Sequence, residues 1–479
     1  MKAWPTAWMI GLTALGGCAI GPDYERPDDN ELYISEPYWD GTKALSMEVD
    51  GNAASVAREN WRSVYRDPLL IDLIEEALEG NLNLERARKR IRQASASARL
   101  ARSLLWPSLE GGFDAERSRD VGSDDPVDTF NLFGLLSWEL DIWGIQRRSA
   151  EAAGADLKAA QYTLAAARIS LIGIIARTYF DLAALNDQLA VTRSTIEIRR
   201  EGLRILNRRK ENGIISGLEI RQAEVSLAEA LRREPQLVFA KQQTENQLSF
   251  LIGRAPGSLD VEPRLREIEY QPDIPTGLPS ELLLRRPDIL ASEQALVAAN
   301  ARIGVTKGNF FPRIRLTGEL GLESAELGQL LDKGNDYFEL AGNLTQPIFE
   351  AGANRARYDQ ALAASEEALI NYRESILMAM HEVSNTLSAY HQSRIQEIAT
   401  LQLLEASNEY LRLAIARYRN GIIGYIDVLD AQRLQFDAEL SLSESRRDQL
   451  IALSGIYQSL GGGWDSENPS PDAPESRVP

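Results

Sequence analysis

Hydrophobic and polar residues alternate with a period of two in several short stretches of the chain. Residues 130–141 place an apolar side chain at nearly every second position, and residues 313–322 and 338–345 do the same. Alternation over about ten residues predicts β-strands with one apolar face, as in a tilted transmembrane strand. A half-buried sheet of a soluble domain shows the same pattern, so the alternation alone leaves both environments open.

Two stretches without proline, residues 142–211 and 353–419, predict very long helices. Roughly 70 residues at about 1.5 Å each would form a rod on the order of 100 Å long. The first stretch contains residues spaced by three and four, which is typical of a coiled-coil seam with two polar interruptions. The seam positions are Leu182, Leu185, Leu189, Thr192, Ile196, Arg199, Leu203 and Leu206.

Each long helix is predicted to end in a tight turn that leads into a shorter return helix. The helix-hairpin turns contain Gly213 and Gly421, each preceded by asparagine, and such a pair is a good stop signal for a helix. The return helices are expected over residues 218–252 and 426–460. Further helical runs, over residues 68–105 and 287–307, are expected to lead into the strands.

The chain carries this order of elements twice. Residues 212–215, Asn-Gly-Ile-Ile, recur at 420–423, a shift of 208 (420 − 212), and the register holds without a gap across residues 144–253. Upstream, Trp106-Pro107 matches Phe311-Pro312 at a shift of 205 (311 − 106). A repeat of this length indicates duplication of a whole half of the protein rather than a solenoid unit.

The amino terminus predicts a lipid anchor. Lys2 precedes a short apolar run that ends at Leu15-Gly16-Gly17-Cys18, and Cys18 is the single cysteine of the chain. Such a segment is typical of a bacterial lipoprotein signal, in which acyl chains are attached to the cysteine. An ordinary secretory signal with an incidental cysteine is the alternative. Similarity to other lipoproteins implies sorting to the outer membrane, because Ala19 rather than aspartate follows Cys18.

The predicted organisation has five segments. They are a signal peptide (1–17), an extended tether from the lipidated Cys18 (18–60), a first repeat (61–264), a second repeat of the same order (265–464) and a disordered acidic tail (465–479).

Composition and charge narrow the class of protein. The 479 residues carry a net charge of −18, which disfavours a nucleic-acid binder because phosphate binding needs clustered positive charge. One cysteine and two histidines exclude a disulfide framework and leave little for a metal centre or a catalytic triad. We find no internal apolar run of membrane-spanning length, which argues against a helical membrane protein. We expect a protein that is not an enzyme and holds no cofactor apart from the covalent lipid on Cys18.

A four-stranded sheet with an apolar face cannot lie in a bilayer alone, because its edge strands would keep unpaired backbone groups. Three chains would supply 12 strands (3 × 4), an even number within the range of outer-membrane barrels. Cyclic symmetry would close the helical rods into a tube as well. The sequence therefore predicts a hollow homotrimer, part β-barrel and part helical barrel.

Three motifs resemble those of the TolC-like outer membrane efflux proteins. They are Cys18-Ala19-Ile20-Gly21-Pro22-Asp23-Tyr24 with Arg26-Pro27, then Leu284-Arg285-Arg286-Pro287-Asp288-Ile289, and Tyr418-Arg419-Asn420-Gly421 running into Tyr425-Ile426-Asp427-Val428-Leu429-Asp430-Ala431-Gln432. The chain is similar to the lipoprotein branch that serves resistance-nodulation-division (RND) pumps, the NodT type, over effectively the whole mature chain.

The resemblance implies a mainly α fold with a transmembrane β-barrel. In that family a trimeric 12-stranded outer-membrane barrel, with four strands per chain, continues into a 12-helix periplasmic α-barrel. The implied function is the exit duct of a tripartite efflux system, which passes small molecules or ions to the exterior. The implied partners are two further copies of the chain, a periplasmic adaptor (membrane fusion) protein, an inner-membrane RND transporter and outer-membrane lipid. The implied location is the outer membrane, lipid-anchored, with a large periplasmic portion.

The resemblance also implies which residues line the periplasmic aperture of the duct. Asp430 matches an inward-facing aspartate of the family, Asp427 lies one turn before it, and Ile426 matches an apolar gate position. Glu219 is the equivalent of Asp427 in the first repeat (427 − 208). Capping of a helix start is the alternative role of Asp427 and Glu219. Where some relatives carry a latching arginine, this chain has Ile423, so apolar packing is expected to replace an ionic latch.

Two other functions remain open at this stage. One is the exit duct of a type I protein secretion system, which has the same architecture and a different cargo. The other is a periplasmic coiled-coil lipoprotein without a pore. Conductance in planar bilayers separates the last from the first two, because a scaffold would conduct nothing.

Overall fold

The computed structural model describes residues 19–28, 61–119, 122, 125–259, 262–265, 268, 286–462 and 464. The predicted signal peptide, Cys18, residues 29–60 of the predicted tether and the predicted tail (465–479) lie outside these residues. The described chain is mostly helical with one four-stranded sheet, which agrees with the coarse fold class expected from the sequence.

The chain divides into two compact units, and each unit takes segments from both repeats. The first unit comprises Met1–Asp28, Lys89–Tyr162 and Ala291–Ser375. The second unit comprises Asp29–Arg88, Thr163–Leu290 and Ile376–Pro479.

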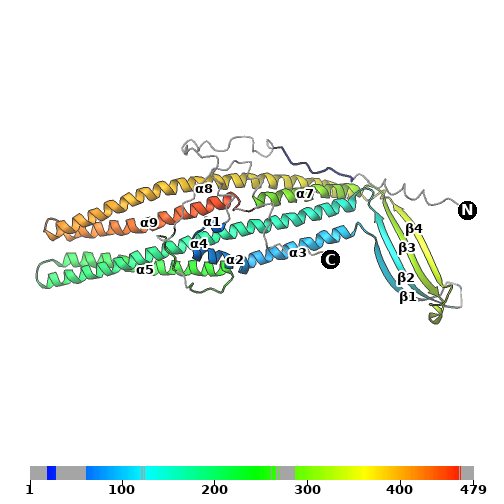
Figure 1. Cartoon of the computed structure of the whole chain (residues 1–479), viewed down its shortest axis with the longest axis horizontal. Coiled ribbons are helices and arrows are strands. Elements are labelled where there is room, and N and C mark those ends of the chain that lie inside the picture. The colour runs from blue at the N-terminus through cyan, green and yellow to red at the C-terminus, as the bar shows by residue number, and fades with distance from the viewer. Residues whose placement is uncertain are drawn as a thin grey trace. The chain divides into compact units, whose positions relative to one another are not determined.

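The sheet belongs to the first unit and is antiparallel throughout, with the order β1-β2-β3-β4 (Figure 1). Each repeat contributes one hairpin, and β2 of the first pairs with β3 of the second. β1 and β4 therefore form the two outer edges of the sheet. The strands are β1 Ser108–Ser118, β2 Val127–Leu140, β3 Arg313–Ser324 and β4 Asp336–Thr345, and a short 3₁₀ turn, η4 Leu327–Gln329, lies between β3 and β4.

The register confirms the predicted apolar face of the sheet. Leu132 pairs with Leu322, and Leu320 pairs with Phe338, so apolar side chains line up across neighbouring strands. This face is open in the single chain, since Leu320 is 69% and Phe338 77% exposed. A sheet of a soluble protein packs such a face on its core, so the exposed apolar face favours the membrane environment over the soluble one.

The long helices confirm the prediction from the proline-free stretches. α4 Ile145–Glu211 and α8 Ala353–Arg419 have 67 residues each. The return helices are α5 Gly217–Ile252 and α9 Tyr425–Ser459, which lie beside α4 and α8 (Figure 1). Every predicted seam position of α4 is buried or half-buried, including Thr192 and Arg199, the two polar interruptions.

The helical run expected over residues 68–105 is divided in two. α2 Pro68–Gly80 stops at Asn81, and α3 Leu82–Ser103 follows. The Asn81 carboxamide oxygen accepts hydrogen bonds from the backbone N–H groups of Asn83 and Leu84, at 2.9 and 3.2 Å, and so caps the new helix. The corresponding helix of the second repeat is α7 Pro287–Gly308, and a single turn, α1 Trp61–Val64, precedes α2.

The core of the second unit packs α2 against α4. Ile74 of α2 and Ile175, Ala176 and Tyr179 of α4 are all fully buried in one cluster. α4 also contains an 18-residue window that is long and apolar enough to cross a bilayer. The expectation that no such run exists is therefore wrong, and the reason is that α4 supplies apolar side chains to this core.

Candidate functional site

The two helix-hairpin turns have the same backbone geometry. Gly213 and Gly421 adopt φ angles of 67° and 71°, in the left-handed region that glycine tolerates. The N–H of Ile214 bonds to the carbonyl of Arg209 at 2.9 Å, and that of Ile422 bonds to the carbonyl of Arg417 at 3.0 Å. These bonds satisfy carbonyl groups at the ends of α4 and α8, as glycine-containing helix stops do.

The first return helix, α5, begins with a complete capping box. Ser216 precedes the helix, and its hydroxyl accepts a hydrogen bond from the N–H of Leu218 at 3.2 Å. The Glu219 carboxylate in turn accepts from the backbone N–H and the hydroxyl of Ser216, at 2.8 and 2.6 Å. The hydrogen bond from the Ser216 hydroxyl holds the pKa of Glu219 below its usual value. Glu219 thus acts as a cap in the single chain.

The second return helix, α9, begins with half of this arrangement. Asp427 accepts a hydrogen bond from the N–H of Gly424 at 3.1 Å. Gly424 stands where the first repeat has Ser216 (424 − 208) and offers no side chain in return. Of the two roles considered for Asp427, capping is therefore present in the structure, and the aperture role stays a prediction.

Asp430 forms an ion pair on the surface of α9. Its carboxylate lies 2.9 Å from the Arg433 guanidinium, which also lies 3.5 Å from Asp437. The hydrogen bond from Arg433 to Asp430 raises the pKa of Arg433. Both partners of the Asp430–Arg433 pair are about half exposed, so water screens the pair and its contribution to stability is small.

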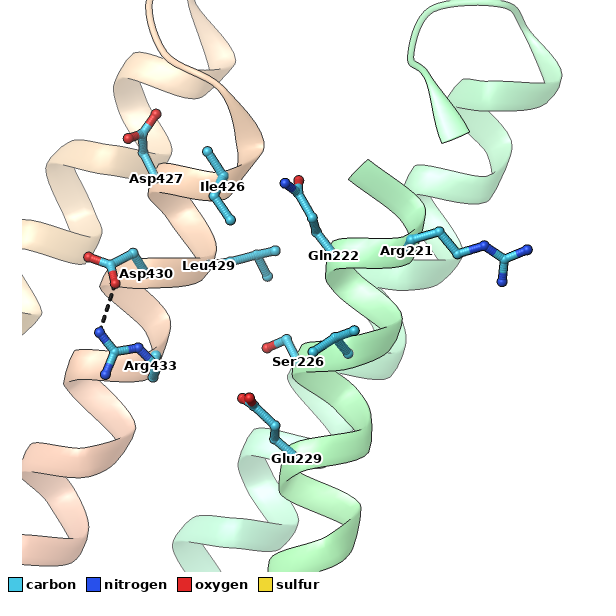
Figure 2. A pocket seen from close by; sticks show the side chains of 10 residues that line it. Arg221, Gln222, Ser226, Glu229, Ile426, Asp427, Leu429, Asp430 and Arg433 are labelled. Atoms are coloured by element: carbon cyan, nitrogen blue, oxygen red, sulfur yellow. Dashed lines mark hydrogen bonds and ion pairs between the residues drawn. The ribbon is translucent and has the colours of Figure 1, made fainter. Parts of the chain in front are cut away.

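An open groove of about 600 Å³ lies between the starts of α5 and α9 (Figure 2). Ile426 and Leu429 point from α9 toward α5, whereas Arg221 points away. Asp430, Asp427 and Ile426 line the groove, so three of the four predicted aperture residues lie together, and Glu219 is not among its lining residues. The lining residues are Arg221, Gln222, Val225, Ser226, Glu229, Ile426, Asp427, Leu429, Asp430 and Arg433.

A polar contact that sequence reasoning missed ties the two turns together. Near the end of α4, Arg209 donates a hydrogen bond to the Tyr418 hydroxyl at 3.0 Å, and its guanidinium lies 5.5 Å from the centre of the Tyr418 ring. The Tyr418 ring in turn lies 5.2 Å from that of Tyr425. Ile423 packs beside both rings in a small apolar cluster around Ala431. Apolar packing thus surrounds the position where a latching arginine was considered.

Arg199 explains one polar interruption of the seam. It is only 5% exposed, and it donates a hydrogen bond to the Ser226 carbonyl of α5. Its guanidinium also lies 5.4 Å from the centre of the Phe436 ring of α9. Burial lowers the pKa of Arg199. One side chain of α4 therefore contacts both return helices.

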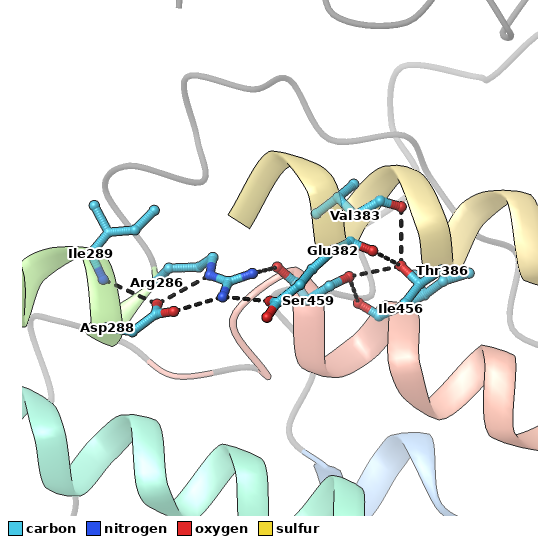
Figure 3. Close-up of polar contacts among 8 residues, drawn as sticks. All are labelled: Arg286, Asp288, Ile289, Glu382, Val383, Thr386, Ile456 and Ser459. Atoms are coloured by element: carbon cyan, nitrogen blue, oxygen red, sulfur yellow. Dashed lines mark hydrogen bonds and ion pairs between the residues drawn. The ribbon is translucent and has the colours of Figure 1, made fainter. Parts of the chain in front are cut away.

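At the opposite end of α9, Arg286 of the Arg-Arg-Pro-Asp motif is buried and binds two carboxylates that are nearly half exposed (Figure 3). Its guanidinium lies 2.6 Å from Asp288, 2.7 Å from Glu382 of α8 and 3.0 Å from the carbonyl oxygen of Ser459, the last residue of α9. Burial alone would lower the pKa of Arg286, but its hydrogen bonds and charge interactions with Asp288 and Glu382 outweigh burial and raise the pKa. The motif therefore joins three helices, a role that its residue types alone did not reveal.

The described residues offer little for metal chemistry. Among them, no group of three His, Cys, Asp or Glu side chains lies close enough to hold a metal ion. His381 contacts Asn385 one turn further along α8, at 2.9 Å between side-chain nitrogens.

Comparison with known proteins agrees with this geometry. The model of the family "outer membrane efflux protein" matches residues 73–254 and 278–462. The outer membrane protein OprJ of Pseudomonas aeruginosa is 33% identical over 476 residues, and the match covers 96% of each chain. The solvent efflux pump outer membrane protein SrpC of Pseudomonas putida is 32% identical, with 95% of this chain and 97% of SrpC covered.

A solved structure gives the same result for the fold. The open state of the MtrE outer membrane channel of Neisseria gonorrhoeae superposes with a TM-score of 0.84 at 30% identity, covering 93% of this chain and 98% of MtrE. The residues matched by the family model include the four strands, both long helices and both return helices. The chain belongs to the outer membrane efflux protein family.

Proposed function

We propose that the chain is one of three identical subunits of an outer-membrane exit duct, through which small molecules or ions leave the cell. The observation that carries this proposal is the sheet of the first unit. It has two outer edges, β1 and β4, and an apolar face that the described residues leave exposed. Pairing β1 of one copy with β4 of the next would satisfy the edges and turn the apolar face toward lipid.

The helical part of the chain suits a periplasmic tunnel. Each chain brings two long helices and two return helices, and three chains around an axis would form a closed helical barrel. The relatives OprJ and SrpC are named as outer membrane proteins, and SrpC as part of a solvent efflux pump. A periplasmic adaptor protein and an inner-membrane RND transporter are therefore the partners we propose for this chain, with the transporter supplying the energy.

The turn region is the proposed aperture of the duct. In a trimer, three copies of Asp430 would lie around the axis, together with Ile426 and Asp427 from the same groove. A ring of carboxylates attracts cations, and apolar side chains beside it narrow the opening. Glu219 would support the aperture indirectly, by capping α5.

We propose that the protein is attached to the membrane in two ways. The sheet would cross the outer membrane, and acyl chains on Cys18 would anchor the amino terminus, with no other cofactor. Two or more acyl chains hold a protein firmly, whereas one chain holds it only reversibly. The lipid would therefore keep each subunit at the membrane before the sheet has closed.

Single-channel recording in planar bilayers tests this function. We expect the full-length lipoprotein to conduct, and Asp430→Ala to raise the conductance of the closed state, because three shorter side chains would leave a wider opening at the proposed aperture. The control is Asp359→Ala, which removes another surface pair, Asp359–Arg355 at 3.0 Å, far along α8 from the turn. A protein that never conducts contradicts the duct, and an equal current in both variants contradicts the aperture role of Asp430.

A further inference from the structure

The two repeats of the chain fold alike in detail. The shift of 208 maps α4 onto α8 from the first residue to the last. In β1 and β2, Ser108 pairs with Ser137. The shifts of 205 and 208 convert this pair into Arg313 and Thr345, which pair in β3 and β4. The two repeats are therefore equivalent building blocks, element by element.

The equivalence extends to the packing beside the turns. Each turn lies next to a small cluster built on three buried apolar residues. In the first repeat these are Leu206, Ile220 and Ala223. In the second repeat they are the same three positions shifted by 208, namely Ala414, Val428 and Ala431. Because the two turn regions are packed alike, they present equivalent surfaces to a neighbouring repeat.

Two polar contacts join the first repeat to the second near the turns. Arg209 of α4 donates a hydrogen bond to the Tyr418 hydroxyl of α8 at 3.0 Å. One residue nearer the start of each coil seam, the Arg199 guanidinium of α4 lies 5.4 Å from the centre of the Phe436 ring of α9. Arg199 is 5% exposed, so water hardly screens this second contact. Both contacts hold α4 against the second repeat of the same chain.

In a ring of three copies, the second repeat of one copy also meets the first repeat of the next. We call the contact between two neighbouring repeats a joint. Equivalent repeats around a closed axis form equivalent joints, alternately within a chain and between copies. The shift of 208 therefore gives the residues at the joint between copies. Position 209 becomes 417 (209 + 208) and position 418 becomes 210 (418 − 208), so Arg417 of one copy lies opposite Lys210 of the next.

The residues at the joint between copies cannot repeat the contacts made within a chain. Arg417 and Lys210 both carry a positive charge, and like charges across an interface repel each other. Both side chains are exposed in the single chain and so are available to face a neighbour. The equivalents of the other pair are Ser407 (199 + 208) and Ala228 (436 − 208), whose side chains are too short for a comparable contact. The joint between copies is thus the weaker of the two near the turns.

We propose that Arg417 of each copy faces Lys210 of the next, and that the aperture opens at these joints while the joints within each chain stay closed. The partner of this surface is a second copy of the chain. Packing of the long helices holds the two cations near each other in the closed duct, and their repulsion favours separation of the copies at the turns. This inference rests on the proposed function, because it requires the trimeric duct.

Charge reversal at the joint tests the proposal by single-channel recording. Lys210→Glu and Arg417→Glu each place opposite charges across the joint between copies, so we expect each variant to lower the frequency of opening several-fold. The double variant restores like charges, so its frequency of opening should return to that of the unaltered protein. Arg208→Glu is the control, because it makes the same change of charge two residues away, on the opposite face of α4.

The double variant separates pairing from a general effect of charge. Added negative charge near an aperture can alter ion flow by itself, and such an effect would grow from the single variants to the double variant. That outcome overturns the proposal. Single variants that open as often as the unaltered protein, or an Arg208→Glu variant that changes as much as they do, also overturn it.

Crosslinking tests whether the two residues meet. Full-length chains that carry Lys210→Cys and a large affinity tag are co-expressed with untagged chains that carry Arg417→Cys. A short bismaleimide can then join these positions only between copies, and we expect a covalent product of one tagged and one untagged chain. The control places Arg209→Cys and Tyr418→Cys on separate chains and should give several-fold less product, because these residues face each other within one chain.

The outcomes of the crosslinking are distinct. Each single-cysteine variant is also treated alone, which accounts for any reaction at Cys18. Equal product from the two pairs, or no product from the first pair in an intact trimer, overturns the assigned contact. Native mass spectrometry of the untreated sample shows whether the trimer is intact. Absence of any oligomer contradicts the proposed function instead of the joint.

Discussion

The two repeats secure the far ends of their return helices at equivalent positions with different chemistry. In the first repeat, the Asn81 side chain donates to the carbonyl of Leu251 near the end of α5, at 2.8 Å. In the second, Arg286 donates to the carbonyl of Ser459 at the end of α9, at 3.0 Å. Asn81 and Arg286 are related by the shift of 205, and Leu251 and Ser459 by the shift of 208. A neutral amide thus corresponds to a buried guanidinium that also joins two carboxylates.

At the other ends of these return helices, next to the turns, the first repeat has the more complete set of polar contacts. α5 begins with the full Ser216–Glu219 capping box, which needs nothing outside its own first turn. α9 begins at Gly424 with one capping bond and relies on Tyr418, Tyr425 and neighbouring apolar residues for the rest. Both turns also pack on a small apolar cluster, which contains Ile220 and Ala223 in the first repeat and Val428 and Ala431 in the second. The difference between the turns therefore lies in the cap, which is complete at α5 and half-made at α9. The weaker cap favours the second turn as the part of the aperture that moves.

The largest expected effect is at the far end of α9. Arg286→Met leaves Asp288, Glu382 and the Ser459 carbonyl without their shared partner and should lower the free energy of unfolding by about 2 kcal/mol. The equivalent change in the first repeat, Asn81→Ala, should cost about 1 kcal/mol, chiefly through the lost cap of α3. Urea unfolding followed by far-ultraviolet circular dichroism measures both. A larger loss for Asn81→Ala would reverse the comparison.

The next effect is at the contact between the turns. Tyr418→Phe removes the hydroxyl that accepts a hydrogen bond from Arg209. It should lower the free energy of local opening at the turns by about 1 kcal/mol. We expect faster hydrogen exchange in residues 418–427 and a higher closed-state conductance. Tyr410→Phe, at an exposed position of α8, is the matched control. Unchanged exchange in Tyr418→Phe would show that the contact does not restrain the second turn.

A smaller effect is expected from swapping the capping residues of α5 and α9. Gly424→Ser supplies the missing hydroxyl and should slow hydrogen exchange at the start of α9 by an amount that corresponds to a few tenths of a kcal/mol. Ser216→Gly should speed exchange at the start of α5 by a similar amount. Mass-spectrometric exchange on peptides from both turns measures this. If the two turns keep their original difference in hydrogen-exchange rate after the capping residues are swapped, the capping residues are not the cause of that difference.

The smallest effect is a pH dependence confined to the first turn. The pKa of Glu219 is lowered in the folded chain, so its cap contributes stability above the pKa of an ordinary glutamate, about 4.3. This contribution is lost as the pH falls through the lowered value, because the protonated carboxyl no longer accepts as a carboxylate. Hydrogen exchange at the start of α5, corrected for intrinsic rates, should therefore speed up as the pH falls below the pKa of an ordinary glutamate, about 4.3. Glu219→Gln should abolish this dependence, and its persistence in that variant would assign it to another group.

The sequence predicted those features that follow from local periodicity. The proline-free stretches predicted α4 and α8, the Asn-Gly pairs predicted both turns, and the period of two predicted which face of β2 is apolar. The aperture candidates came from the family resemblance instead, and of these Ile426, Asp427 and Asp430 line one groove, whereas Glu219 does not line it.

The features it missed depend on contacts between distant residues. The Arg286–Ser459 bond joins residues 173 positions apart, and the Arg209–Tyr418 bond joins residues 209 apart. Residues 19–24 were expected to be part of an unbound tether, because proline, glycine and aspartate are typical of linkers. They bind the first unit instead, with Gly21 against the backbone of Gly304, and no sequence pattern shows that a helical glycine faces another backbone.

Native mass spectrometry of the purified full-length lipoprotein in detergent tests the central claim most directly. The claim is that the sheet, with free edges at β1 and β4, closes only when copies of the chain pair with one another. We expect a single species with the mass of three acylated chains. A species with the mass of one chain, in detergent that preserves the folded sheet, would contradict the account.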